Sequence, residues 1–304
     1  MRTCEELLKE YLANNYEKKA EKIHFKGVEG KDVYNITAPF KSNDKTIILG
    51  RVEPRDSEFS KVCFFENEDS NWCLIEDAPV FDLQDPFYTF INKELIVGGV
   101  EVRLKENSTH EMEWKTVFYK GKDIYTLERF FEGPMGMKDL RIAELKDGKI
   151  IVVTRPQGEK GGRGKVGYTI VDSLKDLTIE VVDNAPLMKD LFIEEEWGGG
   201  NEIHVLNEKL VGILGHIASF DKEGNRHYYP MFITLNIETK EYTEPKLIAI
   251  RKEFLESEAK RPDLEDVVFS GGLIRHGDGK AELYAGISDA DAQKIEIKDP
   301  FYNM

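Results

Sequence analysis

The feature that most constrains the fold of this chain is a pattern that occurs five times. Each copy has a polar residue, a strand-like run, a turn, and a second strand-like run rich in small residues. The polar residues that open the copies are Asn35, Asp85, Asp139, Asn201 and Ser270, at separations of 50, 54, 62 and 69 residues. The second runs end in Gly50-Arg51, Gly98-Gly99, Thr154-Arg155, Gly215-His216 and Ala285-Gly286. Each interval is long enough for a four-stranded sheet with its loops.

Five four-stranded units that close into a ring would form a five-bladed β-propeller, in which the innermost strands converge on one axial pocket. We therefore predict an all-β fold, with residues 1–304 as a single propeller domain. A β-sandwich could use the same strands, but it gives no reason for five polar openers at similar spacing. The propeller predicts that the chemistry of the chain lies where the openers meet.

A short N-terminal helical extension, over residues 1–22, precedes the propeller. Within it, residues 3–22 carry the helix pattern, and Thr3 with Glu6 forms a capping box. The apolar face consists of Leu7, Leu8, Tyr11 and Leu12.

Charge and cysteine content narrow the functional classes. The 42 Lys and Arg residues against 57 Asp and Glu give a formal charge of −15, which argues against nucleic-acid partners. Any anion site must then be a local cluster of cations. The three cysteines have no metal-like spacing, and Glu5, Glu6 and Lys9 stand where a signal peptide would be apolar, so we expect a cytoplasmic protein without a metal. No run is long enough for a membrane span.

Several short motifs resemble one enzyme family in their order and spacing. They are Gln84-Asp85-Pro86, Lys138-Asp139 with Arg155-Pro156, Gly215-His216, and Tyr284-Ala285-Gly286-Ile287-Ser288-Asp289. The chain resembles the mannoside phosphorylases of glycoside hydrolase family 130 over residues 33–297. It resembles more closely the glycosyltransferase family 108 mannosyltransferase-phosphorylases, once described as domain of unknown function 1861. Phe87 stands where the phosphorylase pattern has Arg, which favours the second group.

The resemblance implies an inverting β-mannoside phosphorylase and mannosyltransferase of carbohydrate metabolism, reversible and directed to β-1,2-mannan. Its partners would be mannosides, mannose 1-phosphate and phosphate as co-substrate, with GDP-mannose as an alternative donor and no further cofactor. Asp85 would be the catalytic proton donor, with the proton passing through a sugar hydroxyl. A lone Asp among apolar residues is either a turn cap or a desolvated acid whose pKa is raised.

The nucleophile is inferred from what the first unit lacks. Inverting hydrolysis needs a second carboxylate to activate water, whereas phosphate is already anionic and only has to be positioned. Five-bladed hydrolases of other families carry an Asp base on the first blade, and this chain has Asn35 there. Asp85 would therefore act as an acid without a partner base.

Three residues at equivalent strand ends are the candidates for holding phosphate: Arg51, Arg155 and His216. Arg donates two hydrogen bonds from a planar fork, and His adds one donor or a switchable charge. Taken singly, such arginines are more often surface ion-pair residues, and such a histidine is more often a buried core residue.

The expected sugar contacts are Asn35, Lys138, Asp139, Asn201, Glu202, Tyr284 and Asp289. Their alternatives are structural: an ion pair at a turn for Lys138 and Asp139, a turn cap for Asp289, and a core position for Tyr284. Two other functions stay open, a glycoside hydrolase on the same propeller with water positioned by Asp139 or Glu202, and a glycan-binding propeller without catalysis.

Two glycine-rich stretches are not read as nucleotide-binding motifs. Gly158 to Lys165 lacks the ending of a P-loop, and we expect a hairpin loop near the pocket mouth. The glycines of Trp197-Gly198-Gly199-Gly200-Asn201 more readily allow a close approach of the backbone to the axis or a ligand.

Overall fold

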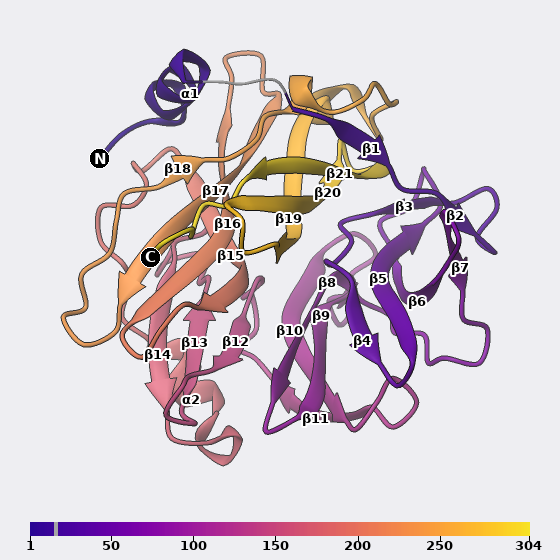
Figure 1. Ribbon diagram of the computed structural model, residues 1–304, viewed down its shortest axis with the longest axis horizontal. Coiled ribbons are helices and arrows are strands. Elements are labelled where there is room, and N and C mark those ends of the chain that lie inside the picture. The colour runs from indigo at the N-terminus through magenta and orange to yellow at the C-terminus, as the bar shows by residue number, and fades with distance from the viewer. Residues whose placement is uncertain (15–17) are drawn as a thin grey trace.

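A computed structural model describes residues 1–14 and 18–304 of the chain, and strands dominate it. The described strands form consecutive antiparallel groups that follow one another around the molecule (Figure 1). The predicted all-β character is confirmed. Strand-like runs in the sequence predict strands at Thr46–Leu49, Lys61–Phe65, Glu113–Tyr119, Lys149–Val153 and Met231–Leu235, and all of these residues except Lys149 fall within observed strands.

A polar opener lies within or beside the first strand of each group. The first contains β3 (Asp32–Tyr34), β5 (Lys45–Glu53), β6 (Lys61–Glu68) and β7 (Asn71–Leu74), with β4 (Phe40–Ser42) beside β5 and β2 (Phe25–Lys26) beside β7. The second contains β8 (Gln84–Ile91), β9 (Glu94–Leu104), β10 (Met112–Gly121) and β11 (Glu128–Glu132). The third contains β12 (Arg141–Glu144), β13 (Ile150–Thr154) and β14 (Gly167–Val171).

The last two groups share one hydrogen-bonded sheet. One contains β15 (Trp197–Val205), β16 (Leu210–Phe220), β17 (Arg226–Asn236) and β18 (Lys246–Leu247). The other contains β19 (Asp266–Arg275), β20 (Lys280–Ile287), β21 (Asp291–Lys298) and β1 (Ala20–Lys22). They join where β17 and β19 pair in parallel. Because β1 pairs with β21, an N-terminal strand completes the C-terminal group (Figure 1).

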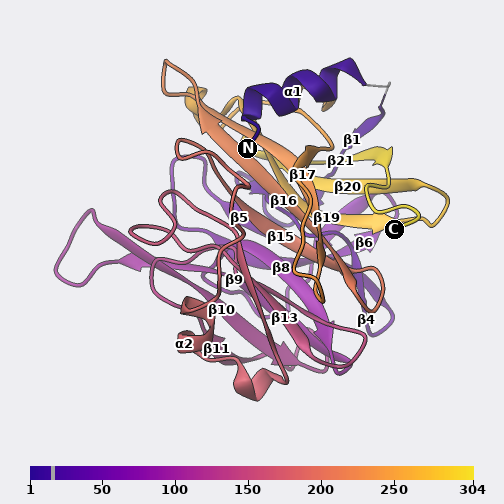
Figure 2. The same cartoon turned by 90° about the vertical axis from the view of Figure 1, so that its left-hand side faces the viewer.

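Helices are short and peripheral. They are α1 (Cys4–Ala13), α2 (Ile179–Asp183), and the single turns η1 (Leu174–Asp176), η2 (Arg251–Glu253) and η3 (Pro262–Leu264). Figure 2 shows α1 at one edge of the molecule, outside the sheets.

The N-terminal helix is shorter than predicted. The capping box forms as expected, because Thr3 Oγ1 accepts from the Glu6 N–H and Glu6 Oε2 accepts from the Thr3 N–H. Cys4 and Leu7 are buried, but Leu12 is exposed. The helix ends at Ala13, residues 15–17 of the expected helix lie outside the described residues, and Ala20–Lys22 is strand β1 because it pairs with β21. Pairing with a sheet has overridden local helix propensity here.

Backbone irregularities mark the polar openers. The register shifts between Gln84 and Phe87 in the β8–β9 pair, beside Asn201 in β15–β16, and beside Ser270 in β19–β20. Asn35, Asp85 and Asp139 adopt positive φ angles of 44°, 49° and 50°. Such bulges and left-handed residues re-aim a side chain out of the regular pleat.

Strands of neighbouring groups contact one another. The first strands β8, β12, β15 and β19 contact in that order, while β5 contacts β8 and β3 contacts β20. Apolar clusters fill the space between groups, for example Phe87, Phe118, Leu140 and Val152 between the second and third. The openers are therefore brought toward one another by packing rather than by sequence proximity.

Candidate functional site

A cavity of about 620 Å³ collects most of the predicted site residues. Those that line it are Asn35, Arg51, Asp85, Lys138, Asp139, Arg155, His216 and Asp289. They come from all the antiparallel groups. Of the openers, Asn35, Asp85 and Asp139 line the cavity, whereas Asn201 and Ser270 do not. The cavity walls also contain aromatic residues that the repeat did not single out: Trp114, Trp197, Phe220, Tyr228 and Phe269.

Asp85 is held by two donors. Its Oδ1 accepts hydrogen bonds from Asn35 Nδ2 at 2.7 Å and from Arg51 Nη1 at 3.2 Å. Burial raises the pKa of Asp85. The positive charges of Arg51 and Lys138 and the hydrogen bond from Asn35 lower it by more than burial raises it, so the pKa lies below its ordinary value. The expectation of a raised pKa is therefore wrong for this site without substrate, and Asp85 is an ionised carboxylate.

Arg51 is fully engaged by the protein. Its Nη2 is 3.1 Å from Glu53 Oε2 and its Nε donates to Ser60 Oγ at 2.8 Å. Glu53 is buried and also accepts from Lys260 Nζ and the Tyr34 hydroxyl. Arg51 is thus clamped between Glu53 and Asp85, and its charge stabilises both carboxylates.

A second clamp holds Asp139. Arg155 Nη1 lies 3.2 Å from Asp139 Oδ2, and Arg141 Nη2 lies 3.5 Å from Asp139 Oδ1. Arg155 also donates to the carbonyl oxygens of Gly198 and Arg163, at 2.9 and 3.2 Å. Arg141 was not among the predicted residues. Its guanidinium lies 4.6 Å from the centre of the Phe87 ring, so an Arg of the third group covers Phe87 of the second.

Lys138 differs from both arginines. Among residues 1–14 and 18–304 its ammonium makes no hydrogen bond or ion pair; it lies 5.4 Å from the Trp114 ring. Burial lowers the pKa of Lys138, while Asp85 and Asp139 oppose that shift. A desolvated cation without a fixed partner, on the wall of a cavity, is suited to an anionic ligand.

His216 is neutral in this environment. Its Nδ1 lies 2.9 Å from Asn201 Oδ1, and burial lowers its pKa to about 4. With Nδ1–H donating to Asn201, the Nε2 atom is left as an acceptor. The residue expected to add a third positive charge therefore adds none.

Three expected sugar contacts do not line the cavity. Asn201 is buried behind His216, where its Oδ1 also lies 3.1 Å from Ser270 Oγ. Glu202 accepts the Leu273 N–H and lies 2.7 Å from His204 Nε2. Tyr284 is 6% exposed and packs in the apolar cluster that contains Val33. Strand alternation and core packing direct the last two side chains away from the site.

Asp289 lines the cavity at a positive φ of 52°. Burial raises its pKa; Arg51 opposes this shift and Asp85 adds to it, and the pKa stays above its ordinary value. No hydrogen bond or ion pair engages its carboxyl within the described part of the chain. The cavity therefore contains two carboxyl groups whose environments shift their pKa values in opposite directions.

The glycine-rich stretches behave as packing and loop elements. A Cβ atom on Gly199 would lie 2.6 Å from Arg155 Cδ, so only glycine leaves that side chain its place. Gly158 and Gly162 form an isolated bridge and line the cavity with Arg163. The Arg163 guanidinium lies 5.4 Å from the Trp197 ring and 4.7 Å from the Phe220 ring. The predicted hairpin loop is thus part of the cavity wall.

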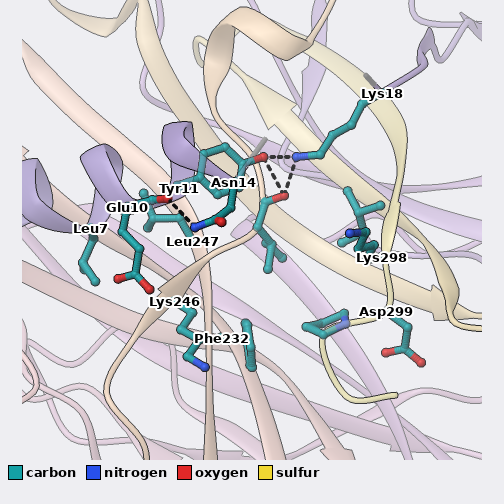
Figure 3. A pocket seen from close by; sticks show the side chains of 13 residues that line it. Leu7, Glu10, Tyr11, Asn14, Lys18, Phe232, Lys246, Leu247, Lys298 and Asp299 are labelled. Atoms are coloured by element: carbon teal, nitrogen blue, oxygen red, sulfur yellow. Dashed lines mark hydrogen bonds between the residues drawn. The ribbon is translucent and has the colours of Figure 1, made fainter. Parts of the chain in front are cut away.

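A smaller hollow of about 290 Å³ lies beneath α1 (Figure 3). Its apolar lining includes Leu7 of α1, together with Phe232 and Leu247 from the sheet beside it. The polar groups there bind one another, since Glu253 Oε2 accepts from the Tyr11 hydroxyl at 2.7 Å and from Lys18 Nζ at 3.0 Å. The contacts around this hollow hold α1 against the sheets. None of the polar openers lines it.

Two further observations concern ligands and membranes. Among the described residues, no three or more His, Cys, Asp or Glu side chains are grouped so that they could hold a metal ion. Residues 1–14 and 18–304 also contain no helix with the length and apolar character to cross a membrane.

The structure is similar to those of several solved proteins. A mannose phosphorylase from Leishmania mexicana, in complex with phosphate ion, is 33% identical with a TM-score of 0.90, covering 98% of this chain and 93% of that chain. A GDP-Man-dependent mannosyltransferase from the same organism is 32% identical with a TM-score of 0.89, covering 99% and 96%. A β-1,2-mannobiose phosphorylase from Listeria innocua, in complex with β-1,2-mannobiose, shares the fold at 17% identity and a TM-score of 0.62, covering 89% and 91%.

A search of curated protein sequences gives no match. The family model that matches residues 9–303 carries the description "Protein of unknown function (DUF1861)". Because the match spans nearly the whole chain, the chain belongs to the DUF1861 family.

Proposed function

We propose that this protein is a β-mannoside phosphorylase, which cleaves a mannoside with inorganic phosphate to give mannose 1-phosphate and can run in reverse. The observation that carries the proposal is Lys138, whose ammonium has no fixed partner in the described part of the chain and lies beside the held carboxylate of Asp85. An anionic nucleophile and a proton donor would thus meet in one cavity. The similarity to a phosphate-bound mannose phosphorylase supports this assignment.

In the proposed reaction, Lys138 anchors phosphate and positions one of its oxygens for attack on the anomeric carbon. Asp85 delivers a proton to the departing sugar oxygen, directly or through a sugar hydroxyl. Attack from the face opposite the leaving group inverts the configuration and yields α-mannose 1-phosphate. Arg51 and Arg155 act through Asp85 and Asp139 and supply a positive field rather than free donors.

The finer features of the proposal rest on the family resemblance and the arrangement of strands. We infer that the antiparallel groups are the five blades of one propeller domain, because strands of successive groups contact one another and three of the polar openers, Asn35, Asp85 and Asp139, line one cavity. A β-1,2 linkage and the use of GDP-mannose as an alternative donor follow the resemblance. The similar mannosyltransferase supports the second of these.

One assay tests the assignment. The protein is incubated with β-1,2-mannobiose and its linkage isomers, with and without phosphate, and the products are identified by NMR. We expect α-mannose 1-phosphate from the β-1,2 isomer only when phosphate is present. A glycan-binding propeller would give no product under either condition, and that result would overturn the proposal.

A second candidate function is an inverting hydrolase. The observation in its favour is Asp289, whose raised pKa would suit an acid while the ionised Asp85 acted as base. The water-positioning roles considered for Asp139 and Glu202 lose support, because arginines engage Asp139 and Glu202 lies outside the cavity. Release of mannose at equal rates with and without phosphate would favour the hydrolase.

A further inference from the structure

The bonding of Asp85 raises a question about its proton. Both groups that contact its Oδ1, the Asn35 amide and the Arg51 guanidinium, can only donate from the atoms involved. An oxygen that accepts two hydrogen bonds is in the state of an ionised carboxylate. The proposed reaction, in contrast, needs Asp85 to carry a proton when the mannoside is cleaved.

The groups around Asp85 account for its ionised state. Positive charge reaches it from Arg51 on β5, from Lys138 and from Arg141 at the start of β12, while the negative charge of Asp289 opposes them. His216 on β16 also faces it and is neutral. Asn35, after β3, adds a hydrogen bond but no charge. Of these cations, Lys138 has no fixed carboxylate partner among the described residues.

Phosphate would change this balance. A dianion bound at Lys138 compensates the charge of that ammonium and adds negative charge beside Asp85, and both effects favour the neutral carboxylic acid. We propose that Asp85 takes up a proton when phosphate binds, so that the nucleophile and the proton that the departing sugar oxygen requires enter the site together. This inference rests on the proposed phosphorylase function.

The proton balance of the cycle then closes. Asp85 as carboxylate, HPO₄²⁻ and one proton from solvent form the loaded site. A phosphate oxygen bonds to the anomeric carbon while the bond to the departing sugar oxygen breaks, and that oxygen receives the proton of Asp85. Asp85 returns to the carboxylate, and the phosphate monoester releases its remaining proton. Asp85 therefore serves as acid only when the nucleophile is present.

Calorimetric titration with inorganic phosphate tests the inference. Titrations at about pH 8, where phosphate is mainly the dianion, are run in two buffers with different heats of ionisation. The dependence of the measured heat on the buffer gives the number of protons taken up. We expect the wild-type protein to take up close to one proton per phosphate, and its affinity to fall roughly tenfold per pH unit in this range.

Two isosteric variants identify the group that accepts the proton. Asp85→Asn should bind phosphate without this uptake, whereas Asp289→Asn should retain it. Infrared difference spectra of the wild-type protein give an independent readout, because a carboxylic-acid carbonyl band should appear on addition of phosphate. This readout decides the matter even if the Asp85→Asn variant does not fold.

The outcomes separate the two proposals. Phosphate binding without proton uptake and without a carboxylic-acid band would overturn the inference and leave the phosphorylase function standing. Uptake that is lost in Asp289→Asn and kept in Asp85→Asn would assign the proton to Asp289 and also overturn it. Absence of both phosphate binding and phosphorolysis in the wild-type protein would overturn the proposed function itself.

Discussion

The Asn35 side-chain amide donates a 2.7 Å hydrogen bond to the carboxylate of Asp85, which lies 50 residues further along the chain. Both residues have left-handed backbone conformations, with φ angles of 44° and 49°. An Asn at this position cannot act as a base, but it fixes the orientation of the neighbouring carboxylate. The role of Asn35, the first opener, is therefore to orient the carboxylate of Asp85, the second opener.

Replacing Asp85 should abolish most turnover while sparing the fold. Asp85→Asn keeps the size of the side chain but removes the proton donor, so we expect phosphorolysis to fall by about 10²- to 10⁴-fold. The rate of mannose 1-phosphate release measures this effect, and an unchanged circular dichroism spectrum serves as the folding control. Wild-type activity in this variant would remove Asp85 from the catalytic role.

Introducing a carboxylate at the first opener should shift the pH dependence. In Asn35→Asp, a second carboxyl group replaces the amide 2.7 Å from Asp85. Like charges at this distance cannot both ionise readily, so the pKa of the pair rises and the acid form persists to higher pH. We expect the alkaline limb of the pH–rate profile to move upward. A profile that coincides with the wild type would show that the two side chains are not coupled during turnover.

The sequence predicted the meeting of distant residues better than their bonding. Regular spacing placed Asn35, Asp85 and Asp139 near one cavity, because repeated units bring equivalent positions together. Spacing carries no information on partners such as Glu53 and Lys260, which are 207 residues apart. The pKa of Asp85 follows from such contacts, and its direction could not be predicted from the sequence.

The lack of information on side-chain partners and direction also explains why some site residues were predicted wrongly or missed. Glu202 follows the opener Asn201, and Tyr284 lies at the end of a second run, but strand alternation and packing turn both side chains away from the cavity. Arg141 lies two residues after Asp139 and resembles an ordinary strand residue until the second clamp is seen. The sequence offers even less reason to place Trp197 and Phe220 in the cavity wall, because aromatic residues in strands are usually core residues.

Lys138 should control the affinity for phosphate. Lys138→Met keeps the length of the side chain and removes the ammonium, and a hydrogen bond to a charged group corresponds to roughly a 10- to 100-fold effect. We expect the KM for phosphate to rise by about this factor, with a smaller change in the KM for the mannoside. Initial rates over a grid of both substrates measure the two constants. Equal changes in both would assign Lys138 to the sugar.

His216 should stay neutral between about pH 5 and 8. Its pKa is lowered to about 4 by burial, so it gains a proton only in strongly acidic solution. NMR titration of the imidazole C–H signals checks this, and the signal missing from His216→Gln identifies the residue. We expect no shift of that signal between about pH 5 and 8. A titration midpoint near neutral pH would restore His216 as a cation for phosphate.

Glu53 should contribute strongly to stability through the clamp on Arg51. It is buried, and Glu53→Gln would leave Arg51 and Lys260 without their shared negative charge. Removing one partner of a buried ion pair typically costs about 3–5 kcal/mol in the free energy of unfolding. Urea denaturation measures this loss. Glu58→Gln is the matched control, since Glu58 is exposed and contacts the same two cations at 4.0 and 3.2 Å. We expect that variant to lose less than about 1 kcal/mol.

The contribution of Glu53 to the free energy of unfolding should also depend on pH in a definite direction. Burial raises the pKa of Glu53. The charge of Arg51 and the hydrogen bonds from Lys260, Ser60 and Tyr34 lower it by more than burial raises it, so the pKa lies below its ordinary value. A carboxyl group whose pKa is lower in the folded state contributes its full stabilisation above the unfolded value of about 4.3, and loses it as the pH falls through the folded value. The difference in unfolding free energy between wild type and Glu53→Gln should therefore shrink in acid. A difference that stays constant would mean that the charge of Glu53 does not stabilise the clamp.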